Sequence, residues 1–260
     1  RKKKKQRDEY WPQFDVLFSN ELASVICHII YKRSSTQCVD HTVHSFSFIF
    51  FNDTATTEIY TLHIVGSVRM CIRDREECVQ AITRTVEREG LKDLVLVGHG
   101  FSGSLVVQAA SEMEAPPKRV VLVAGIVPAP QRPLLSACPA KTRTAFRVMS
   151  LLSSLARQEL KLPSPAINGF LCNGMDSMEI VQLVGFFGPL PTRVLKSKLP
   201  MDTMELPCPV TYVILTQDKM IPPDAQARIA ERFEGVETVE IESCHQVMAQ
   251  HPKELAEVLL

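Results

Sequence analysis

Three nearly continuous apolar runs are the strongest pattern in the chain after residue 75. Leu94–Val97, Arg119–Gly125 and Pro209–Thr216 consist largely of β-branched and aliphatic residues. Such runs are typical of parallel strands that helices cover on both faces, because neither face then meets water. Each run therefore predicts a buried strand.

Helical spacing fills the intervals between these runs. Glu76–Glu89 places its apolar residues on one face, opposite charged residues, and Gly90 follows as a C-cap. Further helices are expected over 225–233 and 252–260, with a short strand at Glu237–Ile241. Strands that alternate with helices predict an α/β fold with a mainly parallel sheet. Prolines interrupt the helical pieces of 128–207, which we interpret as a cap region.

Residues 1–75 do not follow either period, and we interpret them as a non-native or disordered segment. Asn52–Thr61 resembles the translation of a sequencing-library adapter, and Met70–Arg75 resembles that of a transposon-end oligonucleotide. Ile64–Val68 fits the primer that links the two. An unusual N-terminal domain is the alternative. The predicted organisation is thus an artefactual 1–75 and a partial α/β domain over 76–260.

Composition excludes several classes of function. Lysine plus arginine equals aspartate plus glutamate, 29 each, so no bulk charge indicates nucleic-acid binding. The eight cysteines show no metal-ligand spacing, and no apolar run is long enough to span a bilayer. The basic start leads into polar residues and not into a secretory signal. We expect a soluble cytoplasmic protein without a metal, cofactor, nucleic-acid or membrane partner.

The segment LVLVGHGFSGSLVVQAA, residues 94–110, has the form of a nucleophile elbow. A strand, a small-residue turn at Gly98–Gly100 and a helix from about Phe101 match the G-x-S-x-G pattern, which requires small residues around the nucleophile. Gly100 occupies the position where serine belongs. Ser102 is an alternative nucleophile in a register shifted by two, but the strand would then continue through glycines, which oppose it. Ser102 is better explained as a first-turn residue that bonds its own backbone.

Two further loops follow predicted strands, where open α/β sheets place ligands. Asp218 follows the third apolar run, and His245 follows Glu237–Ile241. Elbow, acid and histidine stand in the order Ser…Asp…His, in which His245 is the general base and Asp218 orients it. Singly, Asp218 could only cap a turn, and His245 could be a loop residue without chemistry. His99 is interpreted as a packing and hydrogen-bonding residue.

These segments resemble the methylesterase and hydroxynitrile-lyase branch of the α/β-hydrolase superfamily. LVLVGHGFSG resembles the LVGHSxGG elbow of that branch, and TQDKMIPP and ESCHQVMAQHPKELAEVL resemble its acid and histidine loops. LCNGMD resembles a segment of its cap. The resemblance covers about residues 76–260 and implies an α/β-hydrolase fold, with Asp218 and His245 in the acid and histidine positions.

The chain departs from that family in two places. Gly100 stands at the serine position and cannot form an acyl-enzyme. The glycine is explained either by a sequencing error or by a true pseudoenzyme. The first strands and one oxyanion donor should precede Glu76, where the adapter-like sequence stands, so the N-terminal strands are missing or replaced. The backbone N–H of Phe101 is the remaining candidate oxyanion donor.

The resemblance implies a hydrolase for a small carboxylic ester, with impaired activity as the sequence stands. The alternative is a catalytically inactive protein that uses the same pocket to bind a small molecule or a partner. A third possibility uses His245 as a general base without a covalent step, as a lyase does.

Overall fold

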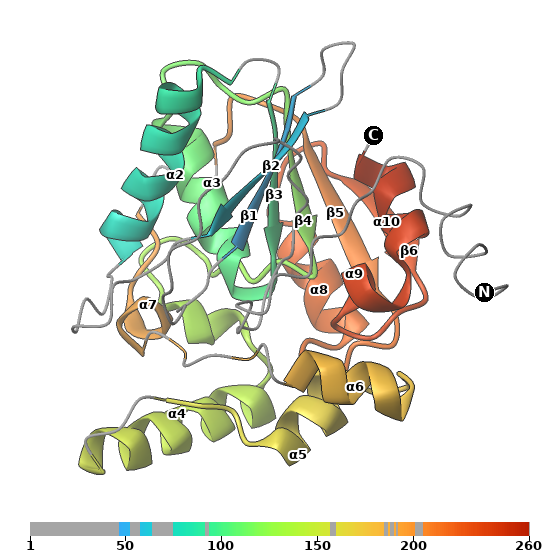
Figure 1. The fold of residues 1–260 in the computed structure, drawn as a ribbon. Helices are drawn as coiled ribbons and strands as arrows, with labels where there is room; N and C mark the ends of the chain where they lie inside the picture. The colour runs from blue at the N-terminus through green and yellow to red at the C-terminus, as the bar shows by residue number, and fades with distance from the viewer. Residues whose placement is uncertain are drawn as a thin grey trace, which may run out of the picture.

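The computed structural model describes residues 47–52, 58–63, 75–91, 94–156, 160–184, 187, 190, 192–200 and 205–259. Within these residues a six-stranded sheet has the order β2-β1-β3-β4-β5-β6. The strands are β1 (Ser47–Asn52), β2 (Glu58–His63), β3 (Leu94–His99), β4 (Arg119–Val123), β5 (Val210–Leu215) and β6 (Glu237–Ile241). Helices flank this sheet, and a separate layer of helices lies below it in Figure 1.

The four strands from β3 to β6 are parallel, which confirms the predicted α/β architecture. β4 pairs with β3 on one side and β5 on the other, and β6 pairs with β5. Almost all residues of β3, β4 and β5 are buried, in agreement with their continuous apolar runs. The loops after β3, β5 and β6 therefore meet at one edge of the sheet.

Four of the five helices that flank the sheet overlap segments predicted to be helical, and the short helix after His245 is not predicted by the sequence pattern. The five helices are α2 (Arg75–Glu89), α3 (Gly103–Glu112), α8 (Pro223–Ala230), α9 (Val247–Gln250) and α10 (Pro252–Leu259). α2 buries Val79 and Ile82 fully, and it ends at Gly90, whose φ of 61° is the left-handed conformation of a glycine C-cap. α2 packs on α3, and α3 packs on β3 and β4.

β3 is longer than the sequence predicts. We expected Gly98 and His99 to belong to the turn, but both lie in the strand, where Gly98 is paired with Leu122 and His99 with Val123. Pairing with β4 outweighs the poor strand propensity of glycine, which is small compared with a complete ladder in a buried sheet. The turn begins at Gly100, in the short 3-10 helix η1 (Gly100–Ser102).

The sheet also contains β1 and β2, which the sequence pattern does not predict. They pair antiparallel with each other, and β1 pairs antiparallel with β3. The aromatic and β-branched composition of residues 47–51 favours a strand. Most of the adapter-like segment, 53–57 and 64–74, lies outside the described residues, so its interpretation as translated adapter stays a prediction.

The cap region lies at the carboxyl edge of the sheet and consists of short elements. These are η2 (Leu134–Ala137), α4 (Ala140–Leu155), α5 (Ser164–Ala166), η3 (Ile167–Leu171), α6 (Ser177–Val184) and α7 (Thr192–Lys196). Pro139 and Pro163 stand directly before α4 and α5, where proline can precede or open a helix but cannot continue one. None of the helices in the described part of the chain has the length and apolar character that crossing a bilayer requires.

Candidate active site

The turn after β3 has the conformation of a nucleophile elbow. Gly100 adopts φ 52°, in the left-handed region that non-glycine residues enter only under strain. The carbonyl of Gly100 accepts a 2.7 Å hydrogen bond from the Ile126 N–H in the loop after β4. Phe101 follows in η1 with its side chain fully buried, which fixes the turn against the core.

Close backbone approach in the elbow depends on a set of glycines. A Cβ on Gly98 would come within 2.9 Å of the Gly103 Cα, and a Cβ on Gly103 would come within 2.9 Å of the Gly125 Cα. The residue of α3 that β3 approaches most closely is therefore Gly103. The sequence signal for it was the glycine at the end of LVLVGHGFSG.

Asp218 is buried in the loop after β5, and both of its carboxylate oxygens are engaged. Oδ1 accepts hydrogen bonds from the N–H groups of Met220 at 2.8 Å and Ile221 at 3.0 Å. Oδ2 lies 2.6 Å from Nδ1 of His245. Asp218 therefore caps the turn with Oδ1 and contacts the histidine with Oδ2, so the two interpretations of this residue are compatible.

His245 is fully buried beside the elbow, and its two ring nitrogens differ in their surroundings. Nδ1 donates to the Asp218 carboxylate, which leaves Nε2 as the nitrogen with a free lone pair. Nε2 is buried and has no hydrogen-bond partner among the described residues. A basic nitrogen held in one tautomer by a buried carboxylate is the arrangement of a general base.

His99 connects the elbow to the histidine loop. Its Nε2 donates a 2.7 Å hydrogen bond to the carbonyl of His245, and the two rings lie with their centroids 4.4 Å apart. Burial, and next the neighbouring His245, hold the pKa of His99 well below its ordinary value, so the ring is neutral. The structure agrees with the interpretation of His99 as a packing and hydrogen-bonding residue.

Because His99 is buried in its neutral form, we expect the free energy of unfolding to fall at acidic pH. Below about pH 6.5 the unfolded chain binds a proton at this position and the folded chain does not, so stability is lost as pH falls. We expect the native protein to lose up to about 1.4 kcal/mol of unfolding free energy per pH unit more than His99→Gln, whose amide can still donate. Urea unfolding between pH 7 and 5 measures this difference, and His251→Gln is the matched control. Equal slopes for native protein and His99→Gln would contradict it.

Two glutamines, the buried Gln226 and the half-buried Gln250, hold the acid and histidine loops, and the sequence pattern did not predict either role. Gln226 on α8 accepts from the Leu215 N–H at 2.9 Å and donates to the Ile221 carbonyl at 2.7 Å, so it closes the acid loop. Gln250 on α9 accepts from the Cys244 N–H at 2.8 Å, directly before His245. The two loops are also joined by a backbone bond from Gln217 N–H to the Ser243 carbonyl at 3.0 Å.

The remaining predicted site residues lie in η1. The Ser102 hydroxyl is buried and donates to the carbonyl of His99 at 2.7 Å, so it bonds its own backbone as expected of a first-turn residue. Phe101, whose backbone N–H is the predicted oxyanion donor, directly follows Gly100. The structure thus brings together Asp218 and His245 and sets Gly100 in the adjoining turn, with Ser102 committed to the turn itself.

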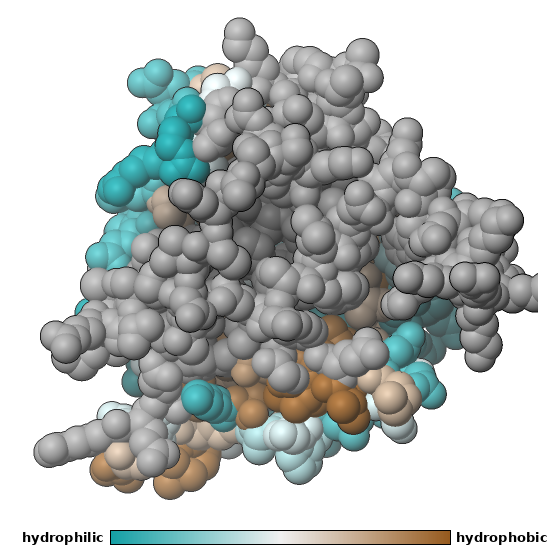
Figure 2. Space-filling model, viewed as in Figure 1, coloured by the Kyte–Doolittle hydropathy of each residue, from teal (hydrophilic) through white to brown (hydrophobic). Residues whose placement is uncertain are grey.

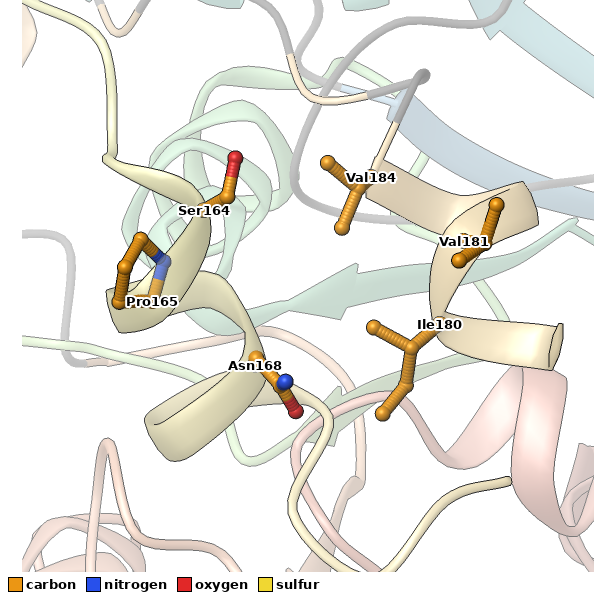
Figure 3. A pocket seen from close by; sticks show the side chains of 6 residues that line it. All are labelled: Ser164, Pro165, Asn168, Ile180, Val181 and Val184. Atoms are coloured by element: carbon orange, nitrogen blue, oxygen red, sulfur yellow. The ribbon is translucent and has the colours of Figure 1, made fainter. Parts of the chain in front are cut away.

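An open groove in the cap is separate from this site. It lies between α5–η3 and α6, has a volume of about 480 Å³, and is lined by Ser164, Pro165, Asn168, Ile180, Val181 and Val184. Figure 3 shows Ile180 and Val184 of α6 facing the α5–η3 segment across it. No cluster of three or more metal-ligating side chains occurs among the residues that the structure describes.

These features define the α/β-hydrolase class. They are a parallel sheet, an elbow with a left-handed residue after one strand, an acid after a second strand and a histidine after a third. Residues 37–258 match the model of the Alpha/beta hydrolase family. The chain belongs to this family. The match spans the adapter-like segment as well as the domain that follows it.

Several solved structures that match this fold have little sequence identity with the chain. An extracellular α/β-hydrolase from a Paenibacillus species is 21% identical, with 75% of this chain and 81% of that chain covered and a TM-score of 0.66. An esterase from Exiguobacterium antarcticum is 10% identical, covering 78% and 80%, with a TM-score of 0.59. A mutant of polyneuridine aldehyde esterase is 16% identical, covering 75% and 82%, with a TM-score of 0.56. A comparison with curated protein sequences finds no match.

Proposed function

We propose that the chain has the site of a carboxylic-ester hydrolase for small esters, in which Gly100 replaces the nucleophile and impairs turnover. The observation that carries this proposal is the buried Asp218–His245 pair, whose free nitrogen has no partner. In such a site the histidine takes the proton of a serine hydroxyl as the hydroxyl attacks the ester carbonyl. The backbone N–H of Phe101 then stabilises the oxyanion.

The similar structures support an ester as the substrate class. Two of them are named esterases, and the Paenibacillus protein is described as sharing structural and functional homology with a tobacco salicylic acid binding protein. We therefore propose a small ester, or the acid that its hydrolysis releases, as the ligand. No metal or organic cofactor has a part in this chemistry. The cytoplasmic location expected from the sequence stays a prediction.

A non-catalytic binding protein is the second candidate, and Gly100 is the observation that favours it. Without a hydroxyl at position 100, His245 can only bind a polar ligand or activate water. Ligand-observed NMR with a small methyl ester separates the two candidates. Binding by the native chain, combined with a Gly100→Ser variant that remains inert, would favour the binding protein.

The native chain should show negligible turnover of p-nitrophenyl acetate. A serine hydrolase that loses one triad residue but is otherwise intact keeps a rate on the order of 10³ above that of the reaction in water. The rate of this chain should not exceed that residual rate. Release of p-nitrophenol measures the rate, with His245→Ala as the reference. Because the Ser102 hydroxyl bonds the turn, Ser102→Ala should leave the rate unchanged. A fast native rate that Ser102→Ala abolishes would move the nucleophile to Ser102.

A further inference from the structure

The exposed large apolar side chains of the described residues all lie in the cap. They are between 50% and 73% exposed and are defined here as the cap face: Val148, Leu151, Leu152, Leu155, Phe170, Met178 and Val181. Figure 2 shows hydrophobic surface along the lower edge of the molecule, where Figure 1 places α4 and α6. Exposed apolar side chains gathered in one region mark an interaction site more often than scattered single residues do.

α4 carries this face as a regular stripe. Val148, Leu151, Leu152 and Leu155 follow the spacing i, i+3, i+4, i+7, which places them on one side of the helix. The buried residues of α4, Phe146 and Ser150, lie on the opposite side. The helix is therefore apolar towards solvent as well as towards the protein, and folding of the described chain leaves the outer stripe uncovered.

Two contacts fix the inner side of α4 to the candidate active site. Phe146 packs edge-on against Phe101 of the elbow with ring centroids 5.2 Å apart. The Thr142 hydroxyl donates a 3.0 Å hydrogen bond to the carbonyl of Met220 in the acid loop. The orientation of α4, with its stripe outward, is thus set by the core of the molecule.

The charge of the cap indicates what covers this face. α4 contains Lys141, Arg143 and Arg147 and no acidic residue, and residues 128–207 hold nine lysines and arginines against five aspartates and glutamates. The whole chain is neutral, so the excess positive charge is local. At the start of α6, the two acidic side chains cap the helix: Asp176 accepts from the Met178 N–H at 2.8 Å, and Glu179 accepts from the Asp176 N–H at 3.2 Å.

We propose that the cap face binds the surface of an anionic phospholipid bilayer, with α4 lying in the interface. Arg143 bonds the carbonyls of Ser136 and Cys138, which leaves Lys141 and Arg147 as the cations of α4 for headgroups. A helix with an apolar stripe and such cations has the composition of interfacial helices, which combine apolar burial with attraction to acidic headgroups. The face also spreads over α4, η3 and α6, and the groove of Figure 3 opens beside Val181. The expectation of no membrane partner was based on spanning segments, which surface binding does not need.

Co-sedimentation of the full chain with phosphatidylcholine vesicles, with and without phosphatidylserine, tests the proposal. We expect binding to the vesicles that contain phosphatidylserine, weakened by salt. The triple variant Leu151→Ala, Leu152→Ala, Leu155→Ala should bind at least tenfold more weakly, since each buried methylene contributes a factor of about four. Alanine preserves helix propensity, and Ser154→Ala on the flank of the same helix is the matched control.

The contribution of charge has its own pair of variants. Arg147→Glu should weaken binding several-fold, whereas Arg228→Glu on α8 makes the same change in net charge away from the cap face and should not. Circular dichroism melts check that each variant is folded. Failure to bind vesicles, equal binding to neutral vesicles, or equal binding by the triple variant and Ser154→Ala would overturn the proposal. The proposal would also be overturned if the native chain does not bind vesicles but forms a dimer, or a complex with an acidic peptide, and the triple variant abolishes that association.

Discussion

Gly100→Ser is expected to convert the chain into an active esterase. Loss of the nucleophile alone costs about 10⁶ in kcat in a complete serine hydrolase, and the hydroxyl here would regain a base that is already in place. The Asp218–His245 bond of 2.6 Å and the left-handed φ of Gly100 mean that the rest of the elbow is already arranged for a nucleophile. We expect an increase of at least about 10³ in the rate of p-nitrophenyl acetate hydrolysis.

The same substitution should lower stability. A serine at φ 52° takes the strained conformation that glycine adopts freely, at a cost of about 1–2 kcal/mol. Higher activity with a lower free energy of unfolding is therefore the expected combination, and urea unfolding alongside the kinetics measures both.

Three variants in the Gly100→Ser background identify the source of the activity. Adding His245→Ala should return the rate to the native level, whereas Ser102→Ala should have little effect. Asp218→Asn should also reduce the rate strongly, because it removes the carboxylate that fixes the histidine tautomer. A folded Gly100→Ser protein with no gain in rate would show that the pocket no longer accepts an ester. Activity that survives His245→Ala would remove His245 from its role as base.

The strands of the parallel sheet could be predicted from the sequence because their pattern is local. Continuous apolar runs and the loops that follow them located β3, β4 and β5, and the carboxyl-end rule then placed Asp218 and His245 at one edge. The composition of a run does not reveal its partner, however. Whether Gly98 and His99 extend β3 depends on pairing with β4, which lies more than twenty residues later.

The supporting residues of the site could not be predicted for the same reason. Gln226 and Gln250 are polar residues on helices, and their patterns resemble those of solvent-facing positions. Their amides become parts of the site only because α8 and α9 fold back onto the loops that carry Asp218 and His245. His99 could be identified as a packing residue, but its bond to the His245 carbonyl joins positions 146 residues apart.

Gly103→Ala is expected to be among the most destabilising single-methyl additions in the domain. The added Cβ would lie 2.9 Å from the Gly125 Cα and 3.0 Å from the Ile126 nitrogen, so backbone atoms and not flexible side chains would have to move. Overpacking of this kind costs about 1–3 kcal/mol, and here it outweighs the gain in helix propensity of up to about 1 kcal/mol. We expect a net loss of about 2 kcal/mol in the free energy of unfolding, measured by urea denaturation.

Gly169→Ala is the matched control, because nothing lies within 4 Å of its added Cβ. It should be neutral or slightly stabilising, since it only restricts the unfolded chain. Movement at Ile126 would also weaken its 2.7 Å hydrogen bond to the Gly100 carbonyl. In the Gly100→Ser background, Gly103→Ala should therefore reduce esterase activity even where the protein is still folded, and Gly169→Ala should not. Equal stability and activity of the two alanine variants would contradict the close approach of β3, α3 and the loop after β4 on which the elbow depends.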